Sequence, residues 1–304
     1  FGSDGIAGTL STESATPIMS IFGYKTAKWT VAGEVGYAKP PAIDYALALD
    51  ISSSMESGGH MDTLRSALDE FSLEAFNGIT SGDVSVTLVP YANGVSFPAK
   101  FAKWLDPVDG LRQAGIFVGC FIAEALPNKA SLSTSKLGAY EAAPDLVLNT
   151  NNTTNIFCPR SGTQISFYAS SETDLLARIK TLESFQGTAT ADGLSWAWRT
   201  LDPDWKSEIG ESTEFPRDYG PQNRKVIILM TDGLPYVRPW TTSKISESKK
   251  DGHKDQALAD FLAVCTAIAR DGRIDLYMIG YGDAMTADDV RAFLDPLPAR
   301  KIWG

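Results

Sequence analysis

DYALALDISSSM, the stretch from Asp44 to Met55, decides the fold. An apolar run of strand length, free of Gly and Pro, ends at Asp50 and continues into a cluster of hydroxyl side chains. This pattern predicts a buried strand that presents polar ligands at its carboxyl end. Asp-x-Ser-x-Ser is a weak signal by itself, because Asp and Ser are common in solvent loops for their turn chemistry alone. The rest of the chain has to decide between a ligand site and an ordinary turn.

Strand patterns and helix patterns alternate along most of the remaining chain. Asn93-Gly94 is a strong hairpin signal, so we expect Val95–Phe97 to return antiparallel to the strand before it. The alternation predicts an α/β fold: a doubly wound, mostly parallel sheet with one antiparallel edge strand and with helices on both faces. Further strands are predicted at 83–91, 225–230 and 274–280, and helices at 64–75, 171–182, 255–270 and 286–293; the stretch 186–198 is predicted to be a hydroxyl-bearing turn that leads into another helix.

Two regions lack this alternation. Residues 1–43 are predicted to form an extended N-terminal segment, in which 28–35 alternates enough to form an edge strand. Residues 101–170 are rich in Pro, Gly, Asn and Ser and are too long for a plain loop, so we predict an inserted, loop-rich subdomain. The main domain is then discontinuous and covers 44–100 and 171–304.

The three cysteines contain no C-x-x-C pair, which argues against a zinc site. Cys120 and Cys158 bracket the irregular region and either close it as a disulfide or remain two separate thiols. A disulfide would place the protein outside the reducing cytosol. Cys265 falls on the apolar face of a predicted helix, where a buried thiol is expected.

The formal net charge of −10 argues against a nucleic-acid partner, because such proteins use clustered Lys and Arg to displace counterions from phosphates. No stretch approaches the length of an apolar membrane span, and no signal peptide is visible. The chain begins at Phe1 rather than Met, so we expect a processed or excised fragment whose anchor or export signal lies outside this sequence.

Oxygen ligands occur in three separate places that an α/β sheet would bring to one edge. Alternation in Asp-x-Ser-x-Ser lets the first, third and fifth residues point the same way, and Thr188 and Asp232 follow later in the chain. Hydroxyls and carboxylates without His or thiolate suit a hard divalent cation, Mg²⁺ with Mn²⁺ or Ca²⁺ as alternatives, rather than Zn²⁺. The predicted metal ligands are Asp50, Ser52, Ser54, Thr188 and Asp232.

These segments resemble, in order, the metal-ion-dependent adhesion site of a von Willebrand factor A domain. The matching parts are Asp50–Ser54, Gly187–Thr190 and Thr231–Gly233. The resemblance implies that the two serines and Thr188 bind the ion through their hydroxyls, and that the aspartates bind directly or through water. It also implies that a partner protein completes the coordination with an Asp or Glu carboxylate. Ser53 is found where many members of the family have Gly, and a serine allows the loop fewer backbone conformations than a glycine would.

The sequence around these segments is similar to the TadG-like branch of bacterial tight-adherence pilus proteins. The similar parts are Leu88–Tyr91, the cysteine-containing insertion, Gly193–Arg199 and Val226–Gly233. The resemblance implies a module for adhesion or pilus assembly in the periplasm, at the outer membrane or on the cell surface. It also implies an N-terminal membrane segment that precedes Phe1 in the full protein.

Two alternatives remain open from the sequence. One is an intracellular A domain that acts as a scaffold in a metal-handling or ATP-driven complex. The other is a metal-dependent hydrolase, which we do not expect, because neither His60 nor His253 has a sequence neighbour that would orient it as a base. No nucleophile elbow or phosphate-binding glycine loop is visible either. We therefore expect a binding protein rather than an enzyme.

Overall fold

The structure, a computed structural model, divides the chain into two compact units between Pro40 and Pro41. In the first unit, β1 (Ile6–Ala15) and β2 (Thr26–Val35) form an antiparallel ribbon that is paired along its whole length. The alternating stretch at 28–35 is therefore part of β2 and pairs with β1. The residues that the structure describes are 6–15, 26–35, 41–77, 82–92, 94–98, 100–101, 105–106, 120–121, 130–132, 140–141, 163–185, 187–235 and 250–280.

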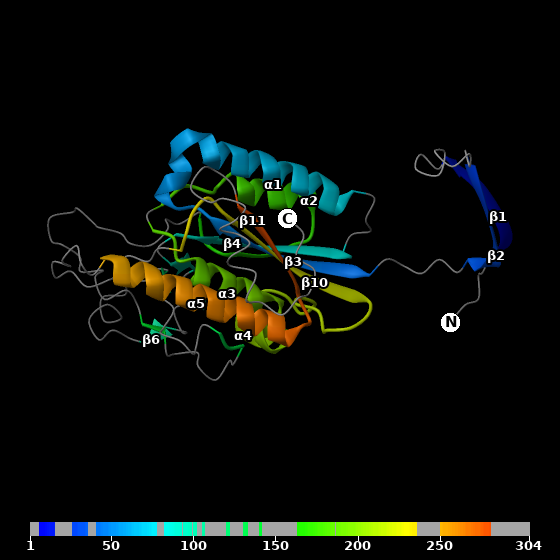
Figure 1. Ribbon diagram of the computed structural model, residues 1–304. Helices are drawn as coiled ribbons and strands as arrows, with labels where there is room; N and C mark the ends of the chain where they lie inside the picture. Colours follow the sequence, from blue (N-terminus) through cyan, green and yellow to red (C-terminus); the bar gives the residue numbers. More distant parts are fainter. Residues whose placement is uncertain are drawn as a thin grey trace. The chain divides into compact units, whose positions relative to one another are not determined.

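A seven-stranded sheet forms the centre of the second unit, in the order β11-β10-β3-β4-β5-β7, with β9 also paired to β4 (Figure 1). The four strands β11, β10, β3 and β4 run parallel, whereas β5, β7 and β9 add antiparallel pairs beyond β4. This confirms the predicted mostly parallel sheet with an antiparallel edge. The strands are β3 (Ala42–Asp50), β4 (Val84–Tyr91), β5 (Val95–Ser96), β7 (Cys120–Phe121), β9 (Ser166–Ala169), β10 (Asn223–Thr231) and β11 (Asp275–Gly280).

Part of the predicted insertion belongs to the central sheet, although its composition does not indicate this. Two strands of the sheet fall within residues 101–170, the predicted insertion: β7 pairs with β5, and β9 pairs with β4 next to Val86 and Leu88. Four residues with a Ser at the start give too short a signal to separate from the polar sequence before them. Within the described part of 101–170, β6 (Leu105–Asp106) and β8 (Tyr140–Glu141) form a small parallel pair of their own.

Helices cover both faces of the sheet, as predicted. α1 and α2 lie on one face, and α3 and α5 lie on the other (Figure 1). Ser171 caps α2 with its hydroxyl, which accepts from the Asp174 amide at 3.3 Å. None of the described helices is both long and apolar enough to cross a membrane. The helices are α1 (His60–Phe76), α2 (Glu172–Ile179), α3 (Thr190–Leu201), α4 (Lys206–Ile209) and α5 (Lys250–Asp271).

The apolar run before Asp50 is the central strand, β3. Its side chains alternate between the two cores: Ala46 and Ala48 pack with α3 and α5, whereas Leu47 and Leu49 pack with α1. A strand buried on both faces needs such a continuous apolar run. The run therefore fixes β3 in the middle of the sheet and places its carboxyl end, Asp50, at a defined edge.

A network of buried charged side chains lies at the end of the sheet away from Asp50. Asp44, at the start of β3, accepts hydrogen bonds from Ser85 at 2.7 Å, from Asn223 at 3.2 Å and from the Lys225 ammonium at 3.2 Å. Arg217 adds its backbone amide at 3.1 Å and its guanidinium to the same carboxylate. Burial lowers the pKa of Lys225, and the Asp44 charge opposes that shift. Each buried charge thus has an opposite charge and hydrogen bonds beside it.

Some predicted features lie outside the described residues. They are Cys158 and the predicted helix at 286–293.

Candidate metal centre

The predicted ligands lie where the connections of the sheet change direction. β3 leads through α1 to β4 on one side, whereas β10 leads through α5 to β11 on the other side. α1 and α5 cover opposite faces (Figure 1). Open α/β sheets bind ligands at such a switch point, outside the carboxyl ends of the strands. Asp50 ends β3 and Asp232 directly follows β10, so both aspartates lie at this place, which we call the polar edge.

Asp50 is fully buried and held from two sides. Its Oδ1 accepts from the Ser52 amide at 2.8 Å, and its Oδ2 accepts from the Thr231 hydroxyl at 2.7 Å. Burial raises the pKa of this carboxyl to about 6; these hydrogen bonds lower it and the nearby Asp232 carboxylate raises it. A cation beside this buried carboxylate would therefore stabilise its ionised form.

A chain of hydrogen bonds connects the two aspartates, and it reaches Asp50 through the Ser52 amide. The Ser52 and Ser54 hydroxyl oxygens are 2.9 Å apart, and the Ser54 hydroxyl donates to Asp232 Oδ1 at 2.8 Å. Ser54 is exposed, whereas Asp50, Ser52 and Asp232 are buried. The cluster is therefore open to the surface on the Ser54 side.

The Thr188 turn is attached to the same edge through its backbone. The Ala189 amide donates to the Ala92 carbonyl at 2.6 Å, and the Phe185 amide donates to the Ile51 carbonyl at 2.6 Å. Thr188 is 9% exposed. Among the described residues, hydrogen bonds thus connect four of the predicted ligands, and backbone pairing brings the fifth to the same edge.

The residue set fits a small hard cation. An octahedral Mg²⁺ with oxygen ligands at about 2.0–2.1 Å keeps neighbouring ligand oxygens about 2.9 Å apart. The oxygen separations of 2.9 Å and 2.8 Å along Ser52, Ser54 and Asp232 are ordinary hydrogen-bond lengths, and they are compatible with this spacing. Within the described part of the chain, no three His, Cys, Asp or Glu side chains form a group that could hold a metal. A cation at the polar edge would therefore depend on the hydroxyls as well as on the two carboxylates.

Two side chains at the polar edge were not among the predicted ligands. Thr231 lies level with Asp50, because Met230 pairs with Leu49 in the preceding register position. His60, for which the sequence showed no neighbour that would orient it as a base, begins α1 and brings Nδ1 within 3.3 Å of Asp232 Oδ2. The hydroxyl at the end of an apolar strand was a usable signal for Thr231. The His60 contact joins residues far apart in the sequence and had no local signal.

The His60 contact predicts a positioning role for this side chain. In His60→Ala, Asp232 loses a partner, so we expect Mg²⁺ affinity measured by calorimetry to fall by about 3- to 10-fold. His60→Asn keeps a polar group and should recover part of the affinity. Unfolding in chelator should change little in either variant. An unchanged Mg²⁺ affinity in His60→Ala would contradict the assignment.

The cysteines are described only in part. Cys265 is a free buried thiol on α5, as predicted, and burial raises its pKa to about 12. Cys158 and the side chain of Cys120 are not described, so their pairing stays a prediction.

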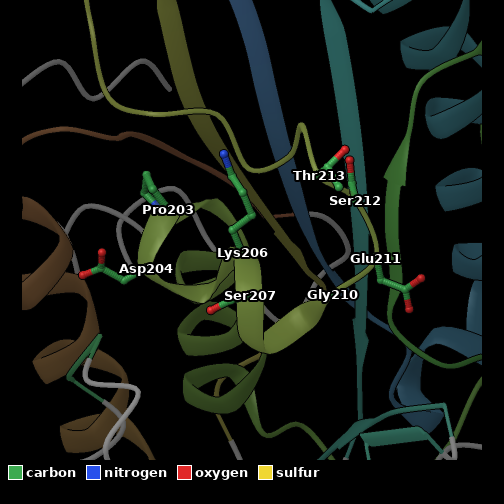
Figure 2. Close-up of a pocket in the computed structure, with 8 residues that line it drawn as sticks. All are labelled: Pro203, Asp204, Lys206, Ser207, Gly210, Glu211, Ser212 and Thr213. Carbon is green, nitrogen blue, oxygen red and sulfur yellow. The ribbon is translucent and has the colours of Figure 1, made fainter.

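A separate hollow of about 730 Å³ lies away from the polar edge (Figure 2). One continuous segment, from Pro203 to Thr213, supplies its lining. This segment leads on to Arg217, which binds Asp44 at the amino end of β3. The hollow therefore belongs to the opposite end of the sheet and contains none of the predicted ligands.

The order of the strands and the helices on both faces define a mixed α/β protein with a doubly wound, mainly parallel sheet, which is consistent with a fold of the von Willebrand factor A or Rossmann type. The sequence matches no known family profile and no curated protein. Solved structures do align with it. The von Willebrand factor domain of the type V pilus tip protein Mfa5 from Porphyromonas gingivalis is 15% identical, with a TM-score of 0.33 over 70% of this chain and 44% of its own.

Two further solved structures show the same level of similarity. The pilus adhesin SpaC from Lactobacillus rhamnosus GG is 16% identical, with a TM-score of 0.43 over 97% of this chain and 32% of its own. Proximal thread matrix protein 1 from the mussel byssus is 12% identical, with a TM-score of 0.37 over 84% and 39%. The chain thus spans less than half the length of each of these three structures.

Proposed function

We propose that this protein is a binding module in which a divalent cation at the polar edge, Mg²⁺ before Mn²⁺ or Ca²⁺, takes a carboxylate from a partner protein. The chain of hydrogen bonds from Asp50 through Ser52 and Ser54 to Asp232 is the observation that carries this proposal. At this site a divalent cation would have two carboxylates as anionic ligands, and its other predicted ligands would be neutral hydroxyls. Such an ion attracts a further anion, and the exposed Ser54 marks the side from which it would arrive.

The setting that we propose is the bacterial envelope, in adhesion or in the assembly of tight-adherence pili. Support comes from the resemblance of the sequence around Leu88–Tyr91, Gly193–Arg199 and Val226–Gly233 to TadG-like proteins. A membrane anchor outside this sequence and a location in the periplasm or at the cell surface are parts of the same proposal. A Cys120–Cys158 disulfide in protein from its native source would favour this setting over an intracellular scaffold.

Metal-assisted hydrolysis is the second candidate, because of one observation. His60 contacts Asp232, and an imidazole held by a carboxylate is a common arrangement of a general base. Turnover of simple esters or nucleotides with Mg²⁺, lost in Asp50→Ala, would favour the enzyme over the binding module.

The test of the binding module is capture of a partner from envelope extracts. Immobilised wild-type protein should retain its partner in Mg²⁺, release it in chelator and bind it again when Mg²⁺ is restored. Thr188→Val removes one predicted ligand hydroxyl at nearly constant volume and should abolish retention. Thr213→Val, an exposed position at the other end of the sheet, is the matched control and should retain the partner. Capture that ignores both the chelator and Thr188→Val would rule the proposal out.

A further inference from the structure

A hollow of about 400 Å³ lies directly beside the polar edge. Part of its wall comes from Glu56, two residues after Ser54, and part from Ser184 and Phe185 in the segment that leads to Thr188. The Ser184 hydroxyl binds the Glu56 carboxylate and so joins the two walls. The Phe185 amide donates to the Ile51 carbonyl, between Asp50 and Ser52. The hollow is thus built from the same loops as the candidate metal centre.

The lining combines apolar and acidic side chains. Met61 and Phe185 are buried or half-buried, whereas the carboxylates of Glu56 and Glu183 are exposed. Arg65 is the cation among the lining residues, and its guanidinium binds the Asp62 carboxylate at 2.9 Å and the Leu182 carbonyl at 2.8 Å. Its charge is therefore offset by Asp62.

The chemistry of this lining selects a long cationic side chain. The methylene groups of Lys or Arg pack on apolar surface while the charged end stays near water and carboxylates, and the half-buried Phe185 together with Glu56 and Glu183 offers both. An anionic group would be repelled by the two carboxylates, and a purely apolar group would form no ion pair with them. The chain's net charge of −10 favours the approach of a basic segment as well.

We propose that this hollow takes a Lys or Arg side chain of the same partner whose carboxylate reaches the cation at the polar edge. The inference rests on the proposed function and names its partner more closely: a segment in which a basic residue lies near an Asp or Glu. The metal ion supplies attachment, and the hollow supplies selectivity among carboxylate-bearing segments.

Synthetic peptides can test the hollow separately from the metal. The probes are capped Gly/Ser peptides with one Asp, the same peptides with one Lys placed one to three residues to either side, and Lys peptides with Asn in place of Asp. Binding to the isotopically labelled chain is followed by NMR amide shifts in Mg²⁺ and in chelator. We expect the best Lys spacing to lower Kd about fivefold relative to Asp alone, the effect of one favourable ion pair with some stem packing.

Charge-matched variants show whether the gain comes from the hollow. Glu56→Gln/Glu183→Gln should remove the Lys advantage and leave binding of the Asp peptide intact. Glu70→Gln/Glu74→Gln, two exposed positions on α1, changes the net charge equally and should keep the advantage. A Lys peptide no better than Asp alone, or a gain that survives in the first variant, overturns the inference while the metal site stands. Asp peptides that show no Mg²⁺-dependent shifts overturn the proposed function, and the inference with it.

Discussion

Asp50→Asn should abolish Mg²⁺ binding and at the same time stabilise the metal-free protein. Binding is lost because the amide removes one of the two carboxylates at the polar edge. Stability rises because the wild type buries a charged group beside Asp232, and burial raises the pKa of Asp50 from 3.8 to about 6. A shift of this size corresponds to roughly 3 kcal/mol of unfolding free energy at neutral pH.

The sign of the pH dependence follows from the direction of that shift. Because the folded state binds the Asp50 proton more tightly than the unfolded state, this group stabilises the fold below pH 3.8, and that stability is lost as pH rises through about 6. The advantage of Asp50→Asn should therefore be full above pH 6 and vanish below pH 3.8. The amide can be accommodated, because the Thr231 hydroxyl has the Gly233 carbonyl within 3.0 Å as another acceptor.

Calorimetry with Mg²⁺ and urea unfolding in chelator measure the two effects. Asp69→Asn, on the exposed side of α1, removes the same charge elsewhere and should alter neither. Equal Mg²⁺ heats for wild type and Asp50→Asn would remove the metal assignment. A less stable metal-free variant would contradict the argument from burial.

Gly193→Ala should destabilise the fold by about 2 to 3 kcal/mol, although alanine favours helices over glycine by about 1 kcal/mol. Gly193 is in α3 and lies against Tyr91 of β4. An added Cβ would lie 2.2 Å from Cδ1 of Tyr91, far inside contact distance. Tyr91 is fully buried, and its hydroxyl donates to the Met230 carbonyl at 3.4 Å, so the ring has little room to move.

Urea unfolding followed by tryptophan fluorescence measures this effect. Gly220→Ala is the matched control, because nothing lies within 4 Å of its added Cβ, and a change within about 0.5 kcal/mol is expected. Adding Tyr91→Leu to Gly193→Ala should recover part of the loss by making space. A more stable Gly193→Ala protein would mean that helix propensity outweighs the close approach.

The sequence predicts those parts of the fold that depend on long local patterns. β3 and β10 are apolar runs that end at or just before an aspartate, and both are core strands with the aspartates at one edge. The positions of Asp50, Thr188 and Asp232 along the chain predict a shared edge, because parallel strands end at the same side of a sheet. Their binding of a metal stays a prediction.

Features that depend on strand register or on short segments have no such local pattern. β9 is four residues long, and its pairing with β4 depends on a neighbour about eighty positions away. The contact of His60 with Asp232 spans 172 positions. The sequence shows Asp44 only as the first residue of a strand. Its partners come from distant parts of the chain: Arg217 lies in a polar segment without periodicity, and Lys225 lies in β10, which follows that segment.

The hydrogen-bond network around Asp44 also fixes the register of β3 against β10, and with it the positions of the residues at the polar edge. Asp44 and Lys225 are direct partners across β3 and β10, about 20 Å from Asp50 along the strand. A slip of one residue would turn every side chain of one strand to the other face, separate this buried ion pair and move Thr231 away from Asp50. A register error that disturbs the polar edge therefore also lowers the stability of the fold, through the loss of the Asp44–Lys225 pair at the other end of the strand. Substitutions at Asp44 or Lys225 would consequently loosen the geometry of the ligands at the far end of the strand, without any change in the ligands themselves.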